Sequence, residues 1–593
     1  MSWTVSLFSI LFIFTILSTA NAKTLELRPK KLDFSPQKFN QLLQQYNSLN
    51  FFDEISADLI NWHHKDLIMD SILGISSDNA YLDFTQIHNN YSQKKVIVAV
   101  IDTGVDINHE DLQGKIWINK KEIPNNGKDD DYNGYIDDYM GWNFLGHGKG
   151  SGIFKTSPTS QQMTYFPGAE EFQAKADTNE IVKHFQYLKR KVETDSLSPL
   201  EQEKFESLLT KILAKRKRAK KLLDDYLLDI KIFKAALSTL KKYGLTEDNL
   251  SLDFLHKIDV NPQNTFDIQA KEKMIDFSEQ EIGLSYLEAQ KNIYQTQFSI
   301  HYNINSNHRD NIVKDNPLQL CEKNYGNNNI IGPDPTHGTH TAGIIAAQRN
   351  NPDSFSKGIA ENVLIMPIRA IPNGDERDKD IINAIYYAVD NGAHIINMSF
   401  GKYFSAHFQE VQKALLYAQK NNVLIITAAG NDYLDLEQTK SYPSPFIKGK
   451  ILSNFITVAA STSFADETLI ANFSNYGQNT VDILAPGKSI YSTIPGNNYA
   501  SMSGTSSAAP IVTGSAAVLL ALNQNLNPAE IKNLLIAGMS NYSLLIVFKS
   551  DVGNTELSNL LLNPGVINLY RSVGLLLEKN NLALNKMASK LYL

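Results

Sequence analysis

Cysteine is nearly absent from the 593-residue sequence, which contains only Cys321. Disulfide frameworks and multi-cysteine zinc or iron–sulfur sites all need several cysteines, so each is excluded. A surplus of positive charge is missing as well, because 63 acidic residues stand against 56 basic ones and the net charge is −7. A dedicated nucleic-acid-binding protein needs a basic surface, so we expect no nucleic-acid partner.

Long apolar runs are missing after the N-terminus, where no stretch approaches the roughly 20 residues that span a bilayer. The run at Val5–Leu17 is followed by small residues that end in Ala20-Asn21-Ala22. This pattern predicts a signal peptide over 1–22, and hence a secreted or periplasmic protein with no membrane span after cleavage. The residues before the run lack Lys and Arg, which leaves an uncleaved N-terminal anchor as the alternative.

Short runs rich in Val and Ile predict buried strands. They lie at Val96–Ile101, Val363–Ala370, His394–Met398, Val423–Ala429, Phe455–Ala460 and Val481–Ala485. The runs are nearly continuous rather than alternating, as in strands that are covered on both faces. Helix-like segments over 379–391 and 407–421 separate three of them. We therefore predict an α/β fold with a parallel sheet flanked by helices.

The strand signal vanishes between about residues 151 and 324, where the sequence is charged and has a helical period. Ser198-Pro199-Leu200-Glu201 is a capping box that predicts a helix running to Tyr243 and ending at Gly244. Ser278 and Glu281 predict the start of another helix towards Phe298. The domain organisation that we expect is a signal peptide (1–22), an N-terminal segment (23–90), a first catalytic part (91–150), a helical insertion (151–324), a second catalytic part (325–550) and a C-terminal tail (551–593).

Three short segments at predicted strand or helix ends carry the residue types of nucleophilic catalysis. Asp102 ends the strand in AVIDTGVD, His337 opens HGTHTAGI, and Ser506 lies in GTSSAAP before an apolar helix over 511–522. A serine hydroxyl needs a base to become a nucleophile, and the base needs a partner that fixes its tautomer. Each segment also has a plainer interpretation: a turn, a zinc pair of His337 with His340, or a helix N-cap.

These segments, together with AAGN at 428–431, resemble the motifs of subtilisin-like serine proteases, the subtilases, and the order Asp, His, Ser matches as well. The wider sequence is similar to a bacterial branch with large insertions, and the segments that carry this similarity are Asn61–His64, Gly374–Asp380 and the acidic loop Lys128–Asp138. The 235 residues between Asp102 and His337 exceed the interval in compact members of the family.

The resemblance implies roles for individual residues. Asp102 would orient His337, His337 would act as the general base, Ser506 would be the nucleophile, and Asn431 would stabilise the oxyanion beside the Ser506 N–H. Substrate-binding residues are implied at Ser399, Phe400, Gly401, Ala428, Ala429 and Gly430.

The loop DDDYNGYIDD over 129–138 resembles the start of a calcium-binding loop, with oxygen ligands at alternate positions and a glycine at the turn. The ligands that we expect are Asp129, Asp131, Asn133, Tyr135 through its carbonyl, and Asp137. The subtilase resemblance adds Asp111. The alternative is a solvated acidic turn without an ion.

A second charged stretch, Gly374–Asp380 (GDERDKD), mixes four acids with two bases before a predicted helix. We expect these charges to neutralise one another at the helix entry.

The sequence therefore predicts a secreted serine endopeptidase that acts on polypeptides through an acyl-enzyme, with Ca²⁺ as a structural cofactor. The alternatives are a catalytically silent subtilase fold that binds partners through its insertion, and a calcium-binding adhesin.

Overall fold

The computed structural model describes residues 60–84, 95–156, 163–194, 197–280, 282–349, 351, 356–447 and 449–579. The predicted signal peptide lies outside these residues, as does most of the predicted N-terminal segment.

A nine-stranded sheet forms the centre of the described fold, with the order β14-β17-β11-β10-β7-β6-β1-β5-β2. Its strands are β1 (Val96–Asp102), β2 (Trp142–Asn143), β5 (Val363–Arg369), β6 (Ile395–Met398), β7 (Leu424–Ala428), β10 (Phe455–Ser461), β11 (Ile483–Pro486), β14 (Ser540–Asn541) and β17 (Gly565–Val566). All neighbours pair in parallel except β14 with β17. The six predicted strands and the parallel α/β class are confirmed.

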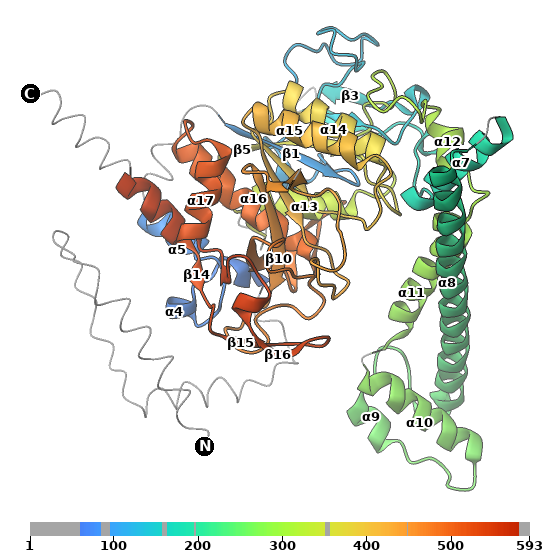
Figure 1. Ribbon diagram of the computed structural model, residues 1–593. Helices are drawn as coiled ribbons and strands as arrows, with labels where there is room; N and C mark the ends of the chain where they lie inside the picture. Colours follow the sequence, from blue (N-terminus) through green and yellow to red (C-terminus); the bar gives the residue numbers. More distant parts are fainter. Residues whose placement is uncertain are drawn as a thin grey trace, which may run out of the picture. The chain divides into compact units, whose positions relative to one another are not determined.

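Helices cover both faces of this sheet (Figure 1). One face packs against α13 (Thr336–Ala346) and α16 (Thr505–Leu522), and the other against α14 (Asp378–Asp390) and α15 (Phe408–Lys420). Strand β1 divides its side chains accordingly, because Val98 and Val100 join the first core whereas Ala99 and Ile101 join the second. Strands buried on both faces have no polar side to show, which explains their continuous apolar sequences.

Helix α16 is long and apolar enough to cross a membrane, but 89% of its apolar window is buried inside the fold. It packs on β7, β10 and β11. It is therefore the central core helix of the sheet, and its first turn carries Ser506.

The insertion is mostly helical, as predicted. Its helices are α7 (Glu180–Thr194), α8 (Pro199–Leu240), α9 (Leu252–Lys257), α10 (Thr265–Glu279), α11 (Leu284–Thr296) and α12 (His308–Val313). The Ser198 capping box is present, and a short 3-10 turn, Lys241–Tyr243, carries α8 to Gly244, whose φ is +86°.

Two expectations for the insertion are wrong. Ser278 belongs to the last turn of α10, and the next helix starts at Leu284 after Gly283. A hairpin of β3 (Ile153–Thr156) and β4 (Met163–Phe166) also lies where no strand was expected. Its strands are only four residues long and too short for a clear periodic signal.

Smaller elements complete the fold. They are α4 (Leu67–Asp70), α5 (Ser77–Asp83), β8 (Phe446–Ile447), β9 (Lys450–Ile451), β12 (Ile490–Ile494), β13 (Asn498–Met502), α17 (Pro528–Gly538), β15 (Ile546–Lys549) and β16 (Gly553–Glu556), with 3-10 turns at Trp62–His64, Glu110–Leu112, Gly148–Gly150, Glu170–Phe172 and Leu557–Asn559 and a π-helical turn at Gln297–His301. Ile75 of the N-terminal segment and Val573, in a helix over 569–579, both join the core beneath α16.

Candidate active site

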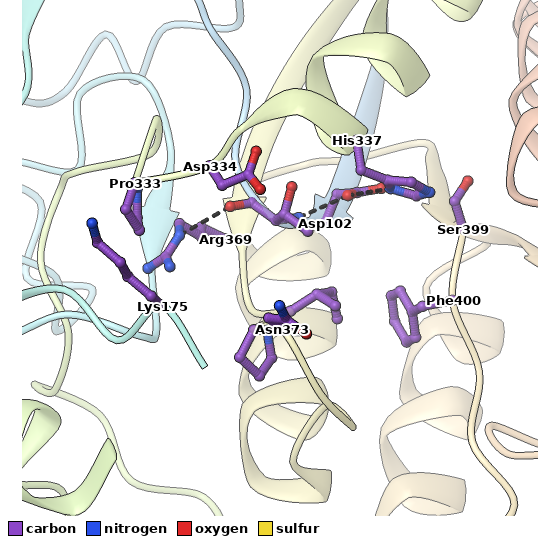
Figure 2. Close-up of a pocket in the computed structure, with 12 residues that line it drawn as sticks. Asp102, Lys175, Pro333, Asp334, His337, Arg369, Asn373, Ser399 and Phe400 are labelled. Carbon is purple, nitrogen blue, oxygen red and sulfur yellow. Dashed lines mark hydrogen bonds and ion pairs between the residues drawn. The ribbon is translucent and has the colours of Figure 1, made fainter. Parts of the chain in front are cut away.

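Asp102 and His337 form a hydrogen-bonded pair at the carboxyl end of the sheet. Asp102 is the last residue of β1, is 1% exposed, and its Oδ1 lies 2.7 Å from His337 Nδ1 in the first turn of α13 (Figure 2). The same oxygen accepts the Thr103 N–H at 2.7 Å, and Oδ2 accepts the Thr341 hydroxyl at 3.4 Å. The carboxylate is therefore fixed by three partners and in turn fixes the imidazole.

Two opposing effects act on the protonation of His337. Burial lowers its pKa, but the negative charge and hydrogen bond of Asp102, with a smaller contribution from Asp334, raise the pKa above the ordinary value of 6.5. An imidazole in this setting accepts a proton more readily than a free one, which suits a general base.

Ser506 lies in the first turn of α16 and is linked to the cavity of this pair through Ser399. Its carbonyl accepts a 2.9 Å hydrogen bond from Ser399 Oγ, and Ser399 lines the same cavity of about 330 Å³ as Asp102 and His337 (Figure 2). A Cβ on Gly504 would stand 2.8 Å from Ser506 Oγ, which is closer than side chains tolerate. The glycine thus leaves the hydroxyl room at the helix N-terminus.

The side-chain amide of Asn431 is held in one orientation. Its Oδ1 accepts hydrogen bonds from Thr505 N at 2.8 Å and from Thr505 Oγ1 at 2.9 Å. The Nδ2 group is left as the donor. A Cβ added to Gly504 would lie 3.3 Å from this Nδ2 and 2.8 Å from Ser506 Oγ. Asn431 Nδ2 and Ser506 Oγ therefore border one small space, where a developing oxyanion can accept from the amide.

Asn475 supports the Asn431 loop, and no role was predicted for it. Its Nδ2 donates to Ala429 O at 2.9 Å, while its Oδ1 accepts from Asp432 N and Leu434 N. Asn475 therefore binds the loop on both sides of Asn431. Gly430, between Ala429 and Asn431, has a φ of +105°, which favours glycine. Since its partners lie more than 40 residues away, no local signal identifies this contact.

Two of the six predicted substrate-binding residues line the same cavity. Ser399 and Phe400 line it, across from Ile371 and Asn373. Ala428 ends β7, and the Gly430 N–H donates to Thr505 Oγ1 at 3.0 Å. Gly401 comes next to Lys402, whose backbone pairs with Tyr442.

Comparison with known proteins identifies the family. The sequence model of the subtilase family, Peptidase_S8, matches residues 93–559, well over half of the chain. The chain belongs to the subtilase family. It is 41% identical over 190 residues to the thermophilic serine proteinase of Bacillus sp. (strain AK1), covering 32% of this chain and 43% of that protein.

Two other curated subtilases show similar values. The cell wall-associated protease of Bacillus subtilis (strain 168) is 39% identical, covering 35% of this chain and 22% of that protein. Thermitase of Thermoactinomyces vulgaris is 36% identical, covering 35% of this chain and 72% of thermitase. The chain thus spans less than half the length of the first two relatives.

The second histidine of this subtilase has a separate environment. His340 is 2% exposed, and its Nε2 hydrogen-bonds to the carbonyls of Ile490 and Ala500 at 2.9 and 3.2 Å. Burial lowers its pKa to about 4. His337 and His340 therefore face different partners rather than a shared metal position, and His340 ties α13 to the β12–β13 hairpin.

The acidic loop of this subtilase gathers two of the predicted metal ligands. Oxygens of Asp129 and Asp131 lie within 4.8 Å of each other and of a Glu122 oxygen. Glu122 has no sequence signal, because it precedes the loop. Burial raises its pKa, and its Oε2 is buried without a hydrogen-bond partner.

Protein groups already contact most of the predicted ligands, including Asp129 and Asp131, whose Oδ1 atoms both accept the Asn133 N–H. Asp137 accepts the N–H groups of Asn126 and Gly127, and Asn133 Oδ1 accepts the Tyr135 N–H. Asp111 accepts from Asn351 and Tyr499.

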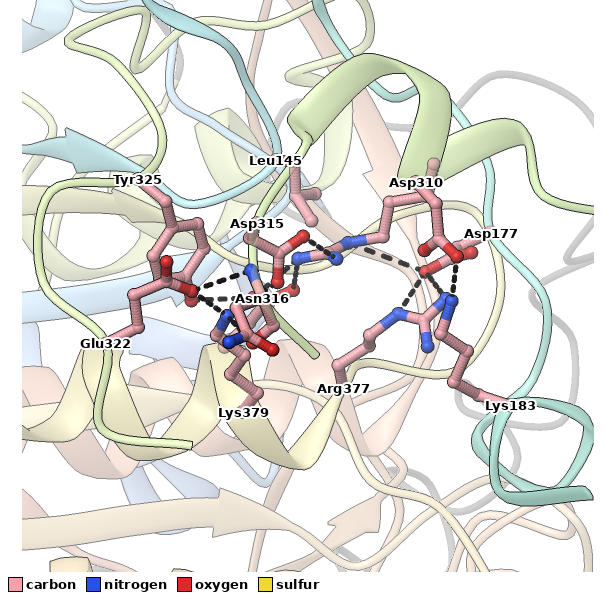
Figure 3. A network of polar contacts seen from close by, with 12 residues as sticks. Leu145, Asp177, Lys183, Asp310, Asp315, Asn316, Glu322, Tyr325, Arg377 and Lys379 are labelled. Carbon is pink, nitrogen blue, oxygen red and sulfur yellow. Dashed lines mark hydrogen bonds and ion pairs between the residues drawn. The ribbon is translucent and has the colours of Figure 1, made fainter. Parts of the chain in front are cut away.

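Charged residues of Gly374–Asp380 do not neutralise one another, so that expectation is wrong. Arg377 pairs with Asp177, and Lys379 with Asp315 and Glu322 (Figure 3). Asp380 is fully buried, and its Oδ1 pairs with Arg309 Nη2 at 2.7 Å. These partners come from the insertion, whereas Asp378 pairs with Lys402 outside it at 2.9 Å. The network therefore joins the insertion to the first turn of α14.

Proposed function

We propose that this subtilase is a serine endopeptidase that hydrolyses polypeptides through an Asp102–His337–Ser506 triad. The observation that carries the proposal is the 2.7 Å bond between Asp102 and His337, in a cavity that is also lined by Ser399, whose hydroxyl donates to the Ser506 carbonyl. Family membership supports the same reaction class.

The reaction begins when Ser506 Oγ attacks the carbonyl carbon of the scissile peptide while His337 takes the hydroxyl proton. The carbonyl oxygen becomes an anion, which accepts from Asn431 Nδ2 and the Ser506 N–H. His337 then gives its proton to the leaving amine, and the acyl group stays on Ser506. Water, deprotonated by His337, attacks this ester and releases the acid and the free serine.

Substrate backbone would pair with the edge at Ser399–Gly401, as an added strand. The uncharged wall of Ala428, Ala429 and Gly430 supports apolar or medium side chains before the scissile bond. Arg, Lys, Asp or Glu at that position would meet no opposite charge on this wall.

A fluorophosphonate probe tests the activated serine, since such probes phosphonylate nucleophilic hydroxyls with loss of fluoride. We expect stoichiometric labelling of Ser506, with none in the Ser506→Ala variant and little in His337→Ala. Ser515, a buried serine of the same helix, is the matched control, and Ser515→Ala should label normally. A folded protein that leaves the probe unreacted would instead support the silent, partner-binding alternative.

We propose in addition that the acidic loop binds Ca²⁺ through Glu122, Asp129 and Asp131. The unpartnered, buried Glu122 Oε2 fits a cation, which would supply the missing contact and screen three clustered carboxylates. Calcium at 100 times its Kd should stabilise the native state by about 2.7 kcal/mol.

Paired variants test this ligand set. Glu122→Gln and Asp129→Asn should remove the rise in melting temperature that calcium causes. Asp137→Asn should retain it, because that carboxylate binds Asn126 and Gly127 instead. An equal melting temperature in EDTA and in calcium would contradict the site.

We further propose that the protein is exported, with cleavage after Ala22. The apolar run at Val5–Leu17 supports this, and one relative is described as cell wall-associated. N-terminal sequencing of protein from an expressing culture should read from Lys23. A retained Met1 would support the anchor instead.

A further inference from the structure

A second cavity, of about 290 Å³, lies between the insertion and the start of α14, and it shares no lining residue with the catalytic cavity. Helix α7 contributes Glu180 and His184, and α14 and the residue before it contribute Lys379 and Arg377. The rest of the lining comes from further residues of α7, from α12, from the loop after α12, and from the residues before α15.

Three residues that line this cavity carry buried polar atoms without hydrogen-bond partners. Glu180 and Arg377 are each 5% exposed, and neither Glu180 Oε2 nor Arg377 Nη1 has a hydrogen-bond partner. Both ring nitrogens of half-buried His184 are likewise buried and unpaired. Leaving a buried polar group unsatisfied is costly, so this concentration around one cavity indicates an occupant.

The edge of the Arg377 guanidinium that carries Nε and Nη2 already binds a carboxylate. Its Nε and Nη2 contact Asp177 Oδ2, which fixes the guanidinium and directs Nη1 away from that carboxylate. Its neighbours Lys183, Arg309 and Lys379 are paired with carboxylates of the insertion. The unsatisfied Nη1 is thus a rigid donor, and three of the cationic side chains near it are already paired.

The chemistry of the open atoms favours a hydrogen-bond acceptor. Five cationic side chains line the cavity against two acidic ones. Burial lowers the pKa of His184 to about 4, so its ring is neutral and carries one N–H. Burial raises the pKa of Glu180 above its ordinary value, which favours a protonated carboxyl that can donate. Pro317, Leu318 and Leu320 add an apolar side to the cavity.

We propose that this cavity binds a small organic carboxylate, whose oxygens accept from Arg377 Nη1 and His184 and whose carbon body lies against Pro317, Leu318 and Leu320. A charge-assisted bond from arginine to a carboxylate is among the stronger polar contacts. The apolar side distinguishes this ligand from inorganic phosphate. A free organic acid and the C-terminus of a short peptide share the chemistry.

Calorimetric titration of the full-length Ser506→Ala protein with N-acetyl-leucine tests the proposal. We expect saturable binding with a Kd of about 1 mM or tighter. N-acetyl-leucinamide, which lacks the carboxylate, should bind at least about tenfold more weakly. N-acetyl-trialanine forms a second arm: binding of both acids indicates a site that admits peptide termini, and binding of N-acetyl-leucine alone indicates a site for free acids.

Variants and hydrogen exchange locate the binding. His184→Phe, which fills the cavity, and Arg377→Lys, which keeps the charge opposite Asp177 but removes Nη1, should each weaken binding about tenfold or more. Lys234→Ala, at an exposed ion pair of α8, should leave it unchanged. Protection from exchange should appear in α7. The proposal would be overturned by equal binding of acid and amide, by no binding of either, by unchanged affinity in both cavity variants, or by protection at 399–401. None of these outcomes would change the results expected for the peptidase variants above.

Discussion

At the scale of single residues, the site depends on how each catalytic group is oriented by a neighbour. Asp102 is held by Thr103 and Thr341, and Asn431 by Thr505. The chemical types of Asp102, His337, Ser506 and Asn431 could be predicted from sequence, because each lies in a short motif at an element end. The contacts of Asn475 and Ser399 could not be predicted, since these residues act across more than 40 positions of the sequence.

Asn431→Leu distinguishes an oxyanion donor from a turn residue. Loss of one donor should lower kcat by about 10²–10³ with KM nearly unchanged, because the amide contacts only the charge that develops in the transition state. Full steady-state kinetics and a melting curve provide the measurement. Asn475→Ala is the matched comparison, and it should lower stability and raise KM by loosening the loop. If Asn431→Leu behaved in that second way, the oxyanion role would be rejected.

Asp334→Asn tests the electrostatic environment of His337. The base must be neutral to take the Ser506 proton, so activity rises as the pH increases through the pKa of His337, which Asp102 and Asp334 hold above 6.5. Removing the exposed Asp334 charge should lower that pKa and move the acid limb of kcat/KM to lower pH. Asp253→Asn, in exposed α9 of the insertion, should leave the profile in place. A shift to higher pH would contradict the assignment.

At the scale of elements, strands were predictable and charge partners were not. Uninterrupted apolar runs predict buried parallel strands, and Ser198 with Glu201 predicts the capped start of α8. The short β3–β4 hairpin has no comparable pattern. The partners of the charges at 374–380 could not be predicted from their sequence neighbours. Folding brings Asp177, Arg309 and Asp315 of the insertion to them.

Arg309→Ala tests whether this network joins the insertion to α14. Arg309 and Asp380 are 1% and 0% exposed, so removing the guanidinium leaves a buried carboxylate without its main partner and should cost about 3–5 kcal/mol. Urea unfolding and limited proteolysis of the insertion measure the loss. Lys220→Ala breaks an exposed pair with Asp224 and should cost at most about 1 kcal/mol. Equal small effects would mean that the network contributes little to stability.

At the scale of the whole molecule, the insertion is attached beside the catalytic cleft. Its Lys175 lines the catalytic cavity, and the backbone of Lys175–Asp177 pairs with Asn373 on the wall opposite Phe400. The cluster of Phe185, Leu208 and Ile212 packs on Phe404, shortly after the proposed substrate edge. The insertion, although distant in sequence from Asp102 and His337, thus forms part of the wall of the catalytic cavity.

The most direct test of the triad is peptide hydrolysis by the Ser506→Ala, His337→Ala and Asp102→Ala variants and by the double variant Ser506→Ala/His337→Ala. Each single variant should lose about 10⁴-fold or more in kcat. The double variant should be no slower than Ser506→Ala, because the three groups act as one unit. Circular dichroism should show an unchanged fold. Hydrolysis that persists in folded Ser506→Ala, or losses that multiply in the double variant, would contradict a triad built on Asp102, His337 and Ser506.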